Sequence, residues 1–182
     1  MEKNSRYPTV ICVTGPESSG KTTLATQLSE YFNAPLVPEI SREYLSKRIS
    51  KGEPSYNKDD ILKIAEYQSK AEKEIISHSK KIVICDTDLL VLQIWLEKKY
   101  KSSKTNLKDA LKSQSKRFYL VTRPNIPWEA DPLRESEHDR DKLFLLHIEY
   151  LNEMKHPFRI IDGQPQERLY DSVNIIDGWV NA

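Results

Sequence analysis

Hydrophobic and polar residues are arranged in blocks of two kinds along this chain. Short apolar runs bounded by polar or turn-forming residues are typical of buried strands. Longer stretches with apolar residues three or four positions apart are typical of amphipathic helices. The runs predict strands at residues 9–13, 36–37, 82–85, 118–121 and 158–161. The longer stretches predict helices at residues 22–32, 41–49, 58–79, 89–96, 135–154 and 167–180.

Strands and helices alternate along the whole chain, which favours a parallel sheet covered by helices on both faces. We therefore predict an α/β fold, a three-layer αβα sandwich around a five-stranded parallel sheet. Polar residues 51–55 and 98–104 indicate a turn and a solvated loop, and residues 123–132 hold three prolines without a regular period. At 182 residues the chain fits a single domain spanning residues 1–182.

Composition excludes several classes of protein. The 28 Lys and Arg nearly balance the 27 Asp and Glu, whereas a nucleic-acid partner would require a basic excess. No apolar run approaches 18 residues and the N-terminal stretch has no signal-peptide core, so we expect no membrane segment and a cytoplasmic location. Cys12 and Cys85 lie in apolar runs and indicate buried thiols in a reducing compartment. The four histidines lack metal-ligand spacing, and the sequence does not indicate an oligomeric state.

Residues 15–22 read GPESSGKT and match the phosphate-binding P-loop pattern G-x-x-x-x-G-K-[ST]. The two glycines allow a tight turn whose successive backbone N–H groups face one phosphate. Lys21 can reach the β- and γ-phosphates, and the Thr22 hydroxyl can bind Mg²⁺. The loop stands between an expected strand and an expected helix, so the helix N-terminus also favours the anion. The ATP-binding residues expected here are Gly15, Pro16, Glu17, Ser18, Ser19, Gly20, Lys21, Thr22 and Thr23.

Polar residues follow the other predicted strands, at the sheet edge where ligands of such folds bind. Asp86 ends an apolar strand, as a Walker-B carboxylate does, and would complete the Mg²⁺ site with Thr22; a helix cap or surface turn is the alternative. Glu39 is a catalytic base, a hydroxyl-binding carboxylate or a solvated helix start. Asp88 is the natural cap of the next helix and a weaker candidate for sugar hydroxyls. After the fifth strand, Gly163 and Gln164 join the expected ATP-binding residues.

Other P-loop classes fit less well than a kinase. The D-x-x-G motif of a GTPase does not occur, and residues 57–60 match N-K-x-D before the third strand, where we interpret them as a helix start. Motor ATPases usually carry a Glu after the Walker-B Asp, where this chain has Thr87. A kinase requires a cationic lid. Arg134 and Arg140 within residues 123–141 could form one, the alternative being an ordinary charged helix face.

In combination, these motifs resemble the nicotinamide riboside kinase domain of the NadR proteins and related stand-alone NadR-like P-loop kinases. The resemblance runs from about Thr14 to Tyr170. GPESSGKT matches the family's E-S-S-G-K-[ST] loop, and Asp86-Thr87-Asp88 matches its D-T-D motif. The segment from Glu39 to Tyr44 matches E-x-x-R-[ED]-[YF], and the segment from Trp128 to Arg134 matches W-x-x-D-x-L-R.

The resemblance implies a P-loop kinase that transfers the ATP γ-phosphate to the ribose 5′-hydroxyl of nicotinamide riboside, with Mg²⁺ as cofactor, giving nicotinamide mononucleotide. Asp86 follows the strand that we expect beside the P-loop strand, so we assign it mainly to Mg²⁺. Glu39 is expected one strand further out, where an acceptor would be held, so we assign it to the sugar or base role. The catalytic residues implied are Lys21, Glu39, Asp86, Arg134 and Arg140. The substrate-binding residues implied are Glu39, Arg42, Tyr44, Gln68, Asp88 and Trp128.

The chain departs from the family in two respects. It has no room for adenylyltransferase or DNA-binding domains, so neither a second step to NAD nor a repressor role is expected. Pro38 stands where NadR proteins tend to carry an aromatic residue; Tyr44, Tyr67 or Trp95 could supply a ring instead. Two alternatives stay open: a kinase for another nucleoside or nucleoside monophosphate, and a regulatory ATPase that acts through a protein partner.

Overall fold

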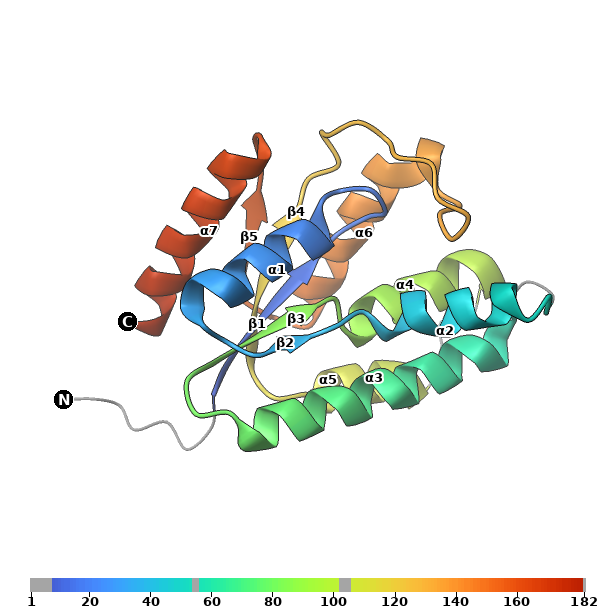
Figure 1. The fold of residues 1–182 in the computed structure, drawn as a ribbon, viewed down its shortest axis with the longest axis horizontal. Helices are drawn as coiled ribbons and strands as arrows, with labels where there is room; N and C mark the ends of the chain where they lie inside the picture. The colour runs from blue at the N-terminus through green and yellow to red at the C-terminus, as the bar shows by residue number, and fades with distance from the viewer. Residues whose placement is uncertain (1–7, 54–55, 102–105, 182) are drawn as a thin grey trace.

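A computed structural model describes residues 8–53, 56–101 and 106–181 of the chain. Its five strands form one parallel sheet in the order β2-β3-β1-β4-β5 (Figure 1). The prediction of a five-stranded parallel sheet is therefore confirmed. The strands are β1 (Thr9–Thr14), β2 (Leu36–Val37), β3 (Ile82–Asp86), β4 (Arg117–Thr122) and β5 (Phe158–Ile161).

Helices connect the strands. Within the described residues, the helices are α1 (Lys21–Phe32), α2 (Ile40–Ser50), α3 (Lys58–His78), α4 (Leu89–Tyr100), α5 (Asn106–Ser113), α6 (Arg140–Glu153) and α7 (Pro165–Val180). Helices α1, α2, α4, α6 and α7 each follow a strand, whereas α3 follows α2 and α5 follows α4. A short 3₁₀ turn, Glu137–Asp139, precedes α6. Helix α3 begins with a capping box between Asn57 and Asp60, so the match to N-K-x-D is a helix start, as the sequence predicts.

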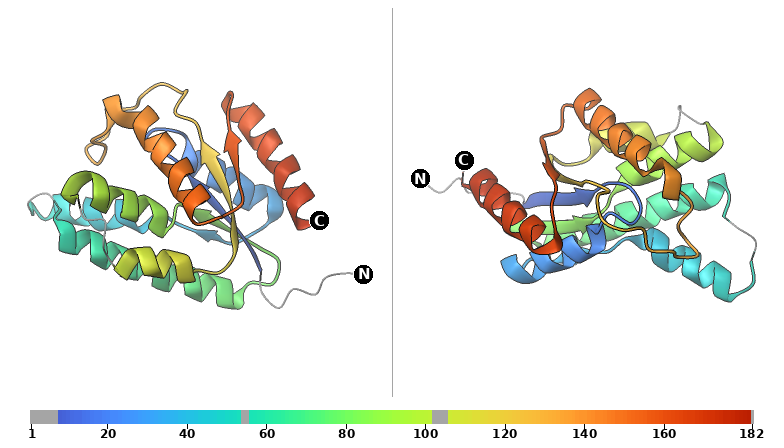
Figure 2. Two further views of the ribbon diagram at one scale, coloured as in Figure 1. Left: turned by 180° about the vertical axis from the view of Figure 1, so that it is seen from behind. Right: turned by 90° about the horizontal axis from the view of Figure 1, so that it is seen from above.

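Alternate residues of the central strands face opposite helical layers, as the pleat of a sheet requires. Ile11 and Val13 of β1 pack with buried side chains of α1 and α7, whereas Val10 and Cys12 pack with those of α3, α4 and α6. The three layers are visible in Figure 2. The predicted αβα sandwich is thus confirmed, with one apolar core on each side of the sheet.

Several element boundaries differ from the prediction. Helix α5 was not expected, and α4 continues through residues 98–100, which the sequence analysis assigned to a loop. Helix α6 begins at Arg140 instead of residue 135. Residues 1–7, part of the turn expected at 51–55 and part of the loop expected at 98–104 lie outside the described residues.

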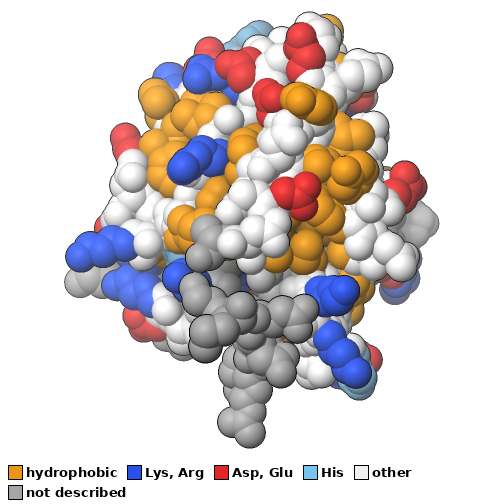
Figure 3. All heavy atoms as spheres, turned by 90° about the vertical axis from the view of Figure 1, so that its left-hand side faces the viewer, with side chains coloured by type: hydrophobic (Ala, Val, Ile, Leu, Met, Phe, Trp, Pro, Cys, Tyr) orange, Lys and Arg blue, Asp and Glu red, His pale blue; other side chains and the backbone are white. Residues whose placement is uncertain are grey.

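The surface carries mixed charges. Figure 3 shows the side of the molecule near the two chain ends, where basic and acidic side chains are scattered among hydrophobic ones. Cys12 and Cys85 are free and buried in the core, as predicted. Among the described residues, no helix is both long enough and apolar enough to cross a membrane.

Candidate active site

A cleft lies at the carboxyl ends of the strands, where the P-loop, the start of α2 and the segment between β4 and α6 meet. The cleft brings together most of the P-loop residues, Glu39 and Arg134 of the expected lid. The residues lining it are Glu17, Ser18, Ser19, Gly20, Lys21, Thr22, Thr23, Glu39, Ser41, Arg42, Leu45, Trp95, Ile126, Glu129, Leu133 and Arg134.

The P-loop requires its two glycines. Gly15 has a φ of +142°, and a Cβ placed there would lie 2.6 Å from Oγ1 of Thr122, so a side chain is excluded both by conformation and by space. Gly20 adopts the left-handed conformation at the N-terminus of α1. Ser19 ties the loop to β4, because its hydroxyl lies 2.6 Å from the Thr122 hydroxyl and donates to the Pro16 carbonyl at 2.7 Å.

Lys21 points back across its own loop and donates from Nζ to the Pro16 carbonyl at 2.7 Å. Burial lowers the pKa of Lys21, although the carboxylates of Glu39, Asp86 and Glu17 act in the opposite direction. The ammonium group therefore stands among three acidic side chains. A bound polyphosphate would bring further negative charge next to this ammonium group, which would attract it.

Asp86 stands at the end of β3, beside Val13 of β1, and is only 3% exposed. Thr22 hydrogen-bonds its carboxylate, but Oδ1 has no hydrogen-bond partner within the described part of the chain. Burial raises the pKa of Asp86 to about 6, with a smaller contribution from the Glu39 carboxylate. A buried carboxylate oxygen without a partner is unfavourable by itself, and a cation bound beside it would remove that cost.

Asp86 and Thr22 offer oxygen ligands of the kind that Mg²⁺ prefers. Within the described residues, no group of three or more His, Cys, Asp or Glu side chains could hold a metal ion. A divalent ion would therefore need ligands from a bound nucleotide and water, as is usual for Mg²⁺ in phosphate sites.

Glu39 follows β2 and precedes α2, and it accepts a hydrogen bond at 2.7 Å from the Ser41 hydroxyl. Because β2 pairs with β3, Glu39 lies one strand further from the P-loop strand than Asp86 does. That is the relative placement predicted from the sequence. Arg42 lines the cleft nearby and donates to Asp131 at 2.9 Å.

Arg134 and Arg140 both contact the P-loop. Arg134 precedes the helix and donates to the Ser18 hydroxyl at 3.4 Å, whereas Arg140 opens α6 and donates to the Ser18 carbonyl at 3.1 Å. The guanidinium carbons lie 6.0 and 5.7 Å from the centroid of the Trp128 ring, within the range of cation–π attraction. Trp128 itself does not line the cleft, so here it supports the two arginines.

Glu17 links the P-loop to the same segment. Its Oε2 accepts hydrogen bonds from the backbone N–H of Glu135 at 3.0 Å and of Ser136 at 2.8 Å. The Ser18 hydroxyl accepts another from Glu129 N–H at 3.0 Å. Sequence reasoning placed both side chains in the P-loop motif but did not anticipate that they hold the segment before α6.

Besides Trp128, nine predicted site residues lie outside the lining of the cleft: Gly15, Pro16, Tyr44, Gln68, Asp86, Asp88, Arg140, Gly163 and Gln164. The Tyr44 hydroxyl donates to Asp60 at 2.8 Å. Gln68 and Asp88 are buried in polar contacts described below. Gly163 and Gln164 begin the turn into α7, where the Gln164 N–H donates to Glu167 at 2.7 Å. Direct ligand contact by these residues stays a prediction.

Sequence reasoning missed parts of the site. Arg168 of α7 donates to the carbonyls of Ser19 at 2.6 Å, Gly163 at 2.8 Å and Arg123 at 2.9 Å, and so joins three loops beside the cleft. Trp95 lines the cleft and stacks on Tyr56, with ring centroids 5.4 Å apart. The sequence indicated Trp95 only as one of three residues that could supply an aromatic ring, and not as an expected site residue. The other lining residues not predicted are Ser41, Leu45, Ile126, Glu129 and Leu133.

Comparison with known proteins agrees with this architecture. Residues 10–168 match the AAA domain family. The trifunctional NAD biosynthesis/regulator protein NadR of Escherichia coli (strain K12) is 31% identical over 166 residues, which make up 89% of this chain and 39% of that protein. The chain thus spans well under half the length of this curated relative.

Solved structures share the fold at lower sequence identity. A NadR protein in complex with NR superposes with a TM-score of 0.80 at 21% identity, over 96% of this chain and 52% of that one. A deoxyadenosine kinase from M. mycoides, solved with dCMP and dCDP, superposes with a TM-score of 0.65 at 14% identity, over 93% of this chain and 100% of that one. The fold is therefore that of the P-loop kinases.

Proposed function

The chain belongs to the AAA domain family and is similar to NadR proteins, and from this premise we propose that it is an ATP-dependent small-molecule kinase. One observation carries the proposal: a single cleft gathers the phosphate-binding Lys21, the acidic Glu39 and the cationic Arg134, with Asp86 close behind them. A phosphoryl-transfer site uses such groups to bind the donor, place the acceptor and neutralise the transferring phosphoryl group.

Each group has a role in this proposal. The P-loop amides and Lys21 bind the β- and γ-phosphates, and residues 163–164 lie toward the nucleotide base. Asp86 and Thr22 would hold Mg²⁺, which supplies charge neutralisation when bound; the unpartnered Oδ1 of Asp86 supports this assignment. Glu39 positions the acceptor hydroxyl and accepts its proton. Residues 123–141 act as a lid that brings Arg134 and Arg140 to the phosphates.

We propose nicotinamide riboside as the acceptor, with the ribose 5′-hydroxyl attacking the γ-phosphate. The similarity to NadR supports this choice, as do the apolar residues in the lining of the cleft. Leu45, Trp95 and Leu133 line the cleft and offer apolar surface, including one aromatic ring, to a flat heteroaromatic base. Trp95 is therefore our candidate for the ring that Pro38 does not provide.

A panel of nucleosides and nucleoside monophosphates tests the acceptor. We expect ATP- and Mg²⁺-dependent phosphorylation of nicotinamide riboside with a higher kcat/KM than for adenosine, deoxyadenosine, uridine or the monophosphates. Trp95→Ala should raise the KM for nicotinamide riboside while the affinity for ATP is kept. Good turnover of another acceptor, and none of nicotinamide riboside, would leave the kinase in place and remove this substrate.

The two carboxylates are tested separately. Glu39→Gln should lower turnover by about 100-fold or more, because it removes the base while Mg²⁺–ATP still binds. Asp86→Asn should remove most of the Mg²⁺-dependent gain in ATP affinity measured by calorimetry. The reverse pattern, in which Glu39→Gln loses the metal effect and Asp86→Asn keeps it, would exchange the two roles.

A further inference from the structure

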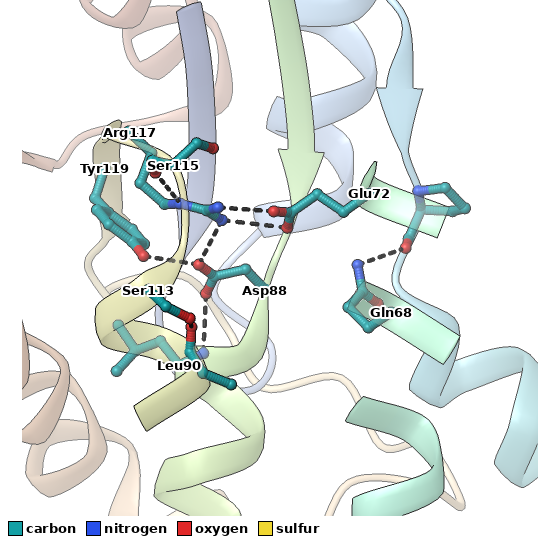
Figure 4. Close-up of polar contacts among 10 residues, drawn as sticks. Gln68, Glu72, Asp88, Leu90, Ser113, Ser115, Arg117 and Tyr119 are labelled. Atoms are coloured by element: carbon teal, nitrogen blue, oxygen red, sulfur yellow. Dashed lines mark hydrogen bonds and ion pairs between the residues drawn. The ribbon is translucent and has the colours of Figure 1, made fainter. Parts of the chain in front are cut away.

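Helix α3 buries three polar side chains: Asp60, which accepts hydrogen bonds from Tyr44 and Arg48, and two others further along the helix. Gln68 and Glu72 lie one turn apart and are 2% and 4% exposed, although Ile61, Ile64 and Ala65 make the same face apolar. A buried amide or carboxylate is unfavourable unless it is hydrogen-bonded, so its partners indicate what it holds in place. Both side chains lead to the loops that carry the two proposed functional carboxylates (Figure 4).

Gln68 holds the backbone on both sides of Glu39. Its Oε1 accepts from the N–H of Ile40 at 3.0 Å, and its Nε2 donates to the carbonyl of Pro38 at 3.3 Å. A glutamine offers a donor and an acceptor on one rigid amide, so it can satisfy both flanking groups at once. The side chain therefore fixes the short loop from which the Glu39 carboxylate reaches the cleft.

A buried ion cluster connects Glu72 with the turn that follows Asp86. Both oxygens of Glu72 accept from the Arg117 guanidinium, at 2.7 and 3.2 Å, and Arg117 also donates to Asp88 at 3.0 Å. The hydroxyl of Tyr119 donates to the same Asp88 oxygen at 2.7 Å. Arg117 and Asp88 are each 1% exposed, so water could not replace a hydrogen-bond partner that this cluster loses.

The cluster ends at the turn that follows β3. Asp88 also caps α4 by accepting from Leu90 N–H at 3.0 Å, so both of its oxygens are used inside the protein. Thr87, between Asp86 and Asp88, has a φ of +66°, which is unfavourable for a β-branched residue and persists only where the surroundings impose it. The Thr87 N–H donates to Val13 O at 2.9 Å, so the turn is held from β1 on one side and from Asp88 on the other.

We infer that α3 sets the positions of both functional carboxylates. Gln68 is a positioning residue for Glu39, and Glu72 acts through Arg117 and Asp88 as a positioning group for Asp86. Gln68 and Asp88, which the family resemblance implied as substrate contacts, thereby act on the reaction from behind the loops that line the cleft. This inference rests on the proposed roles of Glu39 and Asp86.

The Gln68 arm is tested with Gln68→Met, which keeps length and removes both hydrogen bonds. We expect kcat with the best acceptor to fall about tenfold to 100-fold, since misplacing a catalytic group by even 1 Å is costly, while the affinity for Mg²⁺–ATP stays within about twofold. Amide hydrogen exchange at Ile40 should accelerate. The matched control is Gln93→Met, because this buried glutamine donates to Glu97 and Tyr150, and neither of these residues lines the cleft.

The Asp88 arm is tested with Tyr119→Phe, which removes one hydrogen bond to Asp88 and no charge. We expect the Mg²⁺-dependent part of ATP affinity to weaken severalfold, with ATP affinity in EDTA unchanged. Tyr150→Phe is the matched control, because it also removes a buried tyrosine hydroxyl, here one that accepts from Gln93 at 3.4 Å. Both variants should lose similar stability, but only Tyr119→Phe should alter the metal effect.

The outcomes separate this inference from the proposed function. If Glu39→Gln loses turnover but Gln68→Met behaves like its control, the proposed function stands and the positioning role of Gln68 is wrong. If Asp86→Asn loses the metal effect but Tyr119→Phe matches Tyr150→Phe, the Asp88 arm is wrong. Full turnover by Glu39→Gln together with a normal metal effect in Asp86→Asn would remove the proposed roles themselves, and the inference with them.

Discussion

Asp86 shows at the residue scale how a candidate metal ligand can weaken the fold that presents it. Its carboxylate is buried, and one oxygen lacks a hydrogen-bond partner among the described residues. The pKa of about 6, against an ordinary value of 3.8, means that the folded protein holds a proton which the unfolded chain releases between these pH values. The contribution of Asp86 to the free energy of unfolding therefore falls as the pH rises from about 4 to about 6, and it is lowest at higher pH.

We expect Asp86→Asn to stabilise the protein free of nucleotide and metal. At pH 8 the gain in the free energy of unfolding should be about 1–3 kcal/mol, because the variant removes a buried charge that a shift of about two pKa units represents. Toward pH 4.5 the gain should shrink, since Asp86 is then largely protonated. Urea unfolding at both pH values measures it, with exposed Asp171→Asn as control. The prediction would be contradicted if Asp86→Asn lowered the free energy of unfolding by the same amount at pH 8 and at pH 4.5.

Lys21 provides the complementary test on the donor side. Its Nζ donates to the Pro16 carbonyl of its own loop, and burial already lowers its pKa, so replacing it should cost little stability. We expect Lys21→Ala to reduce phosphoryl transfer by at least about 100-fold through lost charge stabilisation, with little change in the thermal midpoint. The control is Lys142→Ala, whose side chain is 82% exposed. Near-normal turnover by folded Lys21→Ala would refute the kinase proposal.

Sequence reasoning located best the residues that their neighbours in the chain identify. Lys21 is defined by an octapeptide, and Asp86 by the end of an apolar run, so neighbours in the chain suffice to place them. Gln68 and Arg117 are different, because the groups that they link, apart from Ser115 next to Arg117, lie 28 to 45 positions away in the sequence. In the sequence, Arg117 is an ordinary charge beside a strand; only the packing of α3 against β3 and β4 turns it into a buried ion pair.

At the scale of elements, strands were predicted within one residue at each end, whereas helix ends were less certain. The expected strands are bounded by polar residues, and β1, β3 and β4 extend by one residue into these bounding positions, β4 at both ends. Helix α5 was missed because only Leu107 and Leu111 of its eight residues are buried apolar side chains. Helix α6 was expected five residues early because charged residues 135–139 are compatible with a helix but form the contacts of the lid segment instead.

The two arginines at the start of α6 lead to a further prediction. Arg134 and Arg140 both donate to Ser18, so the segment before α6 packs on the P-loop. We expect Arg134→Ala and Arg140→Ala each to lower kcat by about tenfold or more and to change the affinity for ATP much less, because their contact with the phosphates forms mainly in the transition state. Exposed Arg159→Ala is the control. Normal turnover in both variants would reduce the segment to a solvated connection.

At the scale of the whole molecule, sheet order decides how the proposed donor and acceptor meet. The order β2-β3-β1-β4-β5 sets the P-loop strand in the centre, with Asp86 on one neighbour and Glu39 one strand beyond it. The lid segment leaves β4 on the other side of β1 and returns over the P-loop. The nucleotide phosphates would thus lie between an acidic acceptor side and a cationic lid side, an arrangement that serves transfer to a bound molecule better than attack by water.

This arrangement separates a kinase from a regulatory ATPase that acts through a protein partner. We expect ADP release with ATP and Mg²⁺ alone to be slow, because Thr87 and not an acidic residue directly follows Asp86, and both oxygens of Asp88 are already hydrogen-bonded inside the protein. Nicotinamide riboside should accelerate ADP release by about 100-fold or more, with one phosphorylated acceptor formed per ADP, since the bound hydroxyl replaces water as nucleophile. Coupled ADP detection beside chromatography of the acceptor measures both quantities. ADP release that no acceptor of the panel accelerates, but that continues without a phosphorylated product, would favour the regulatory ATPase.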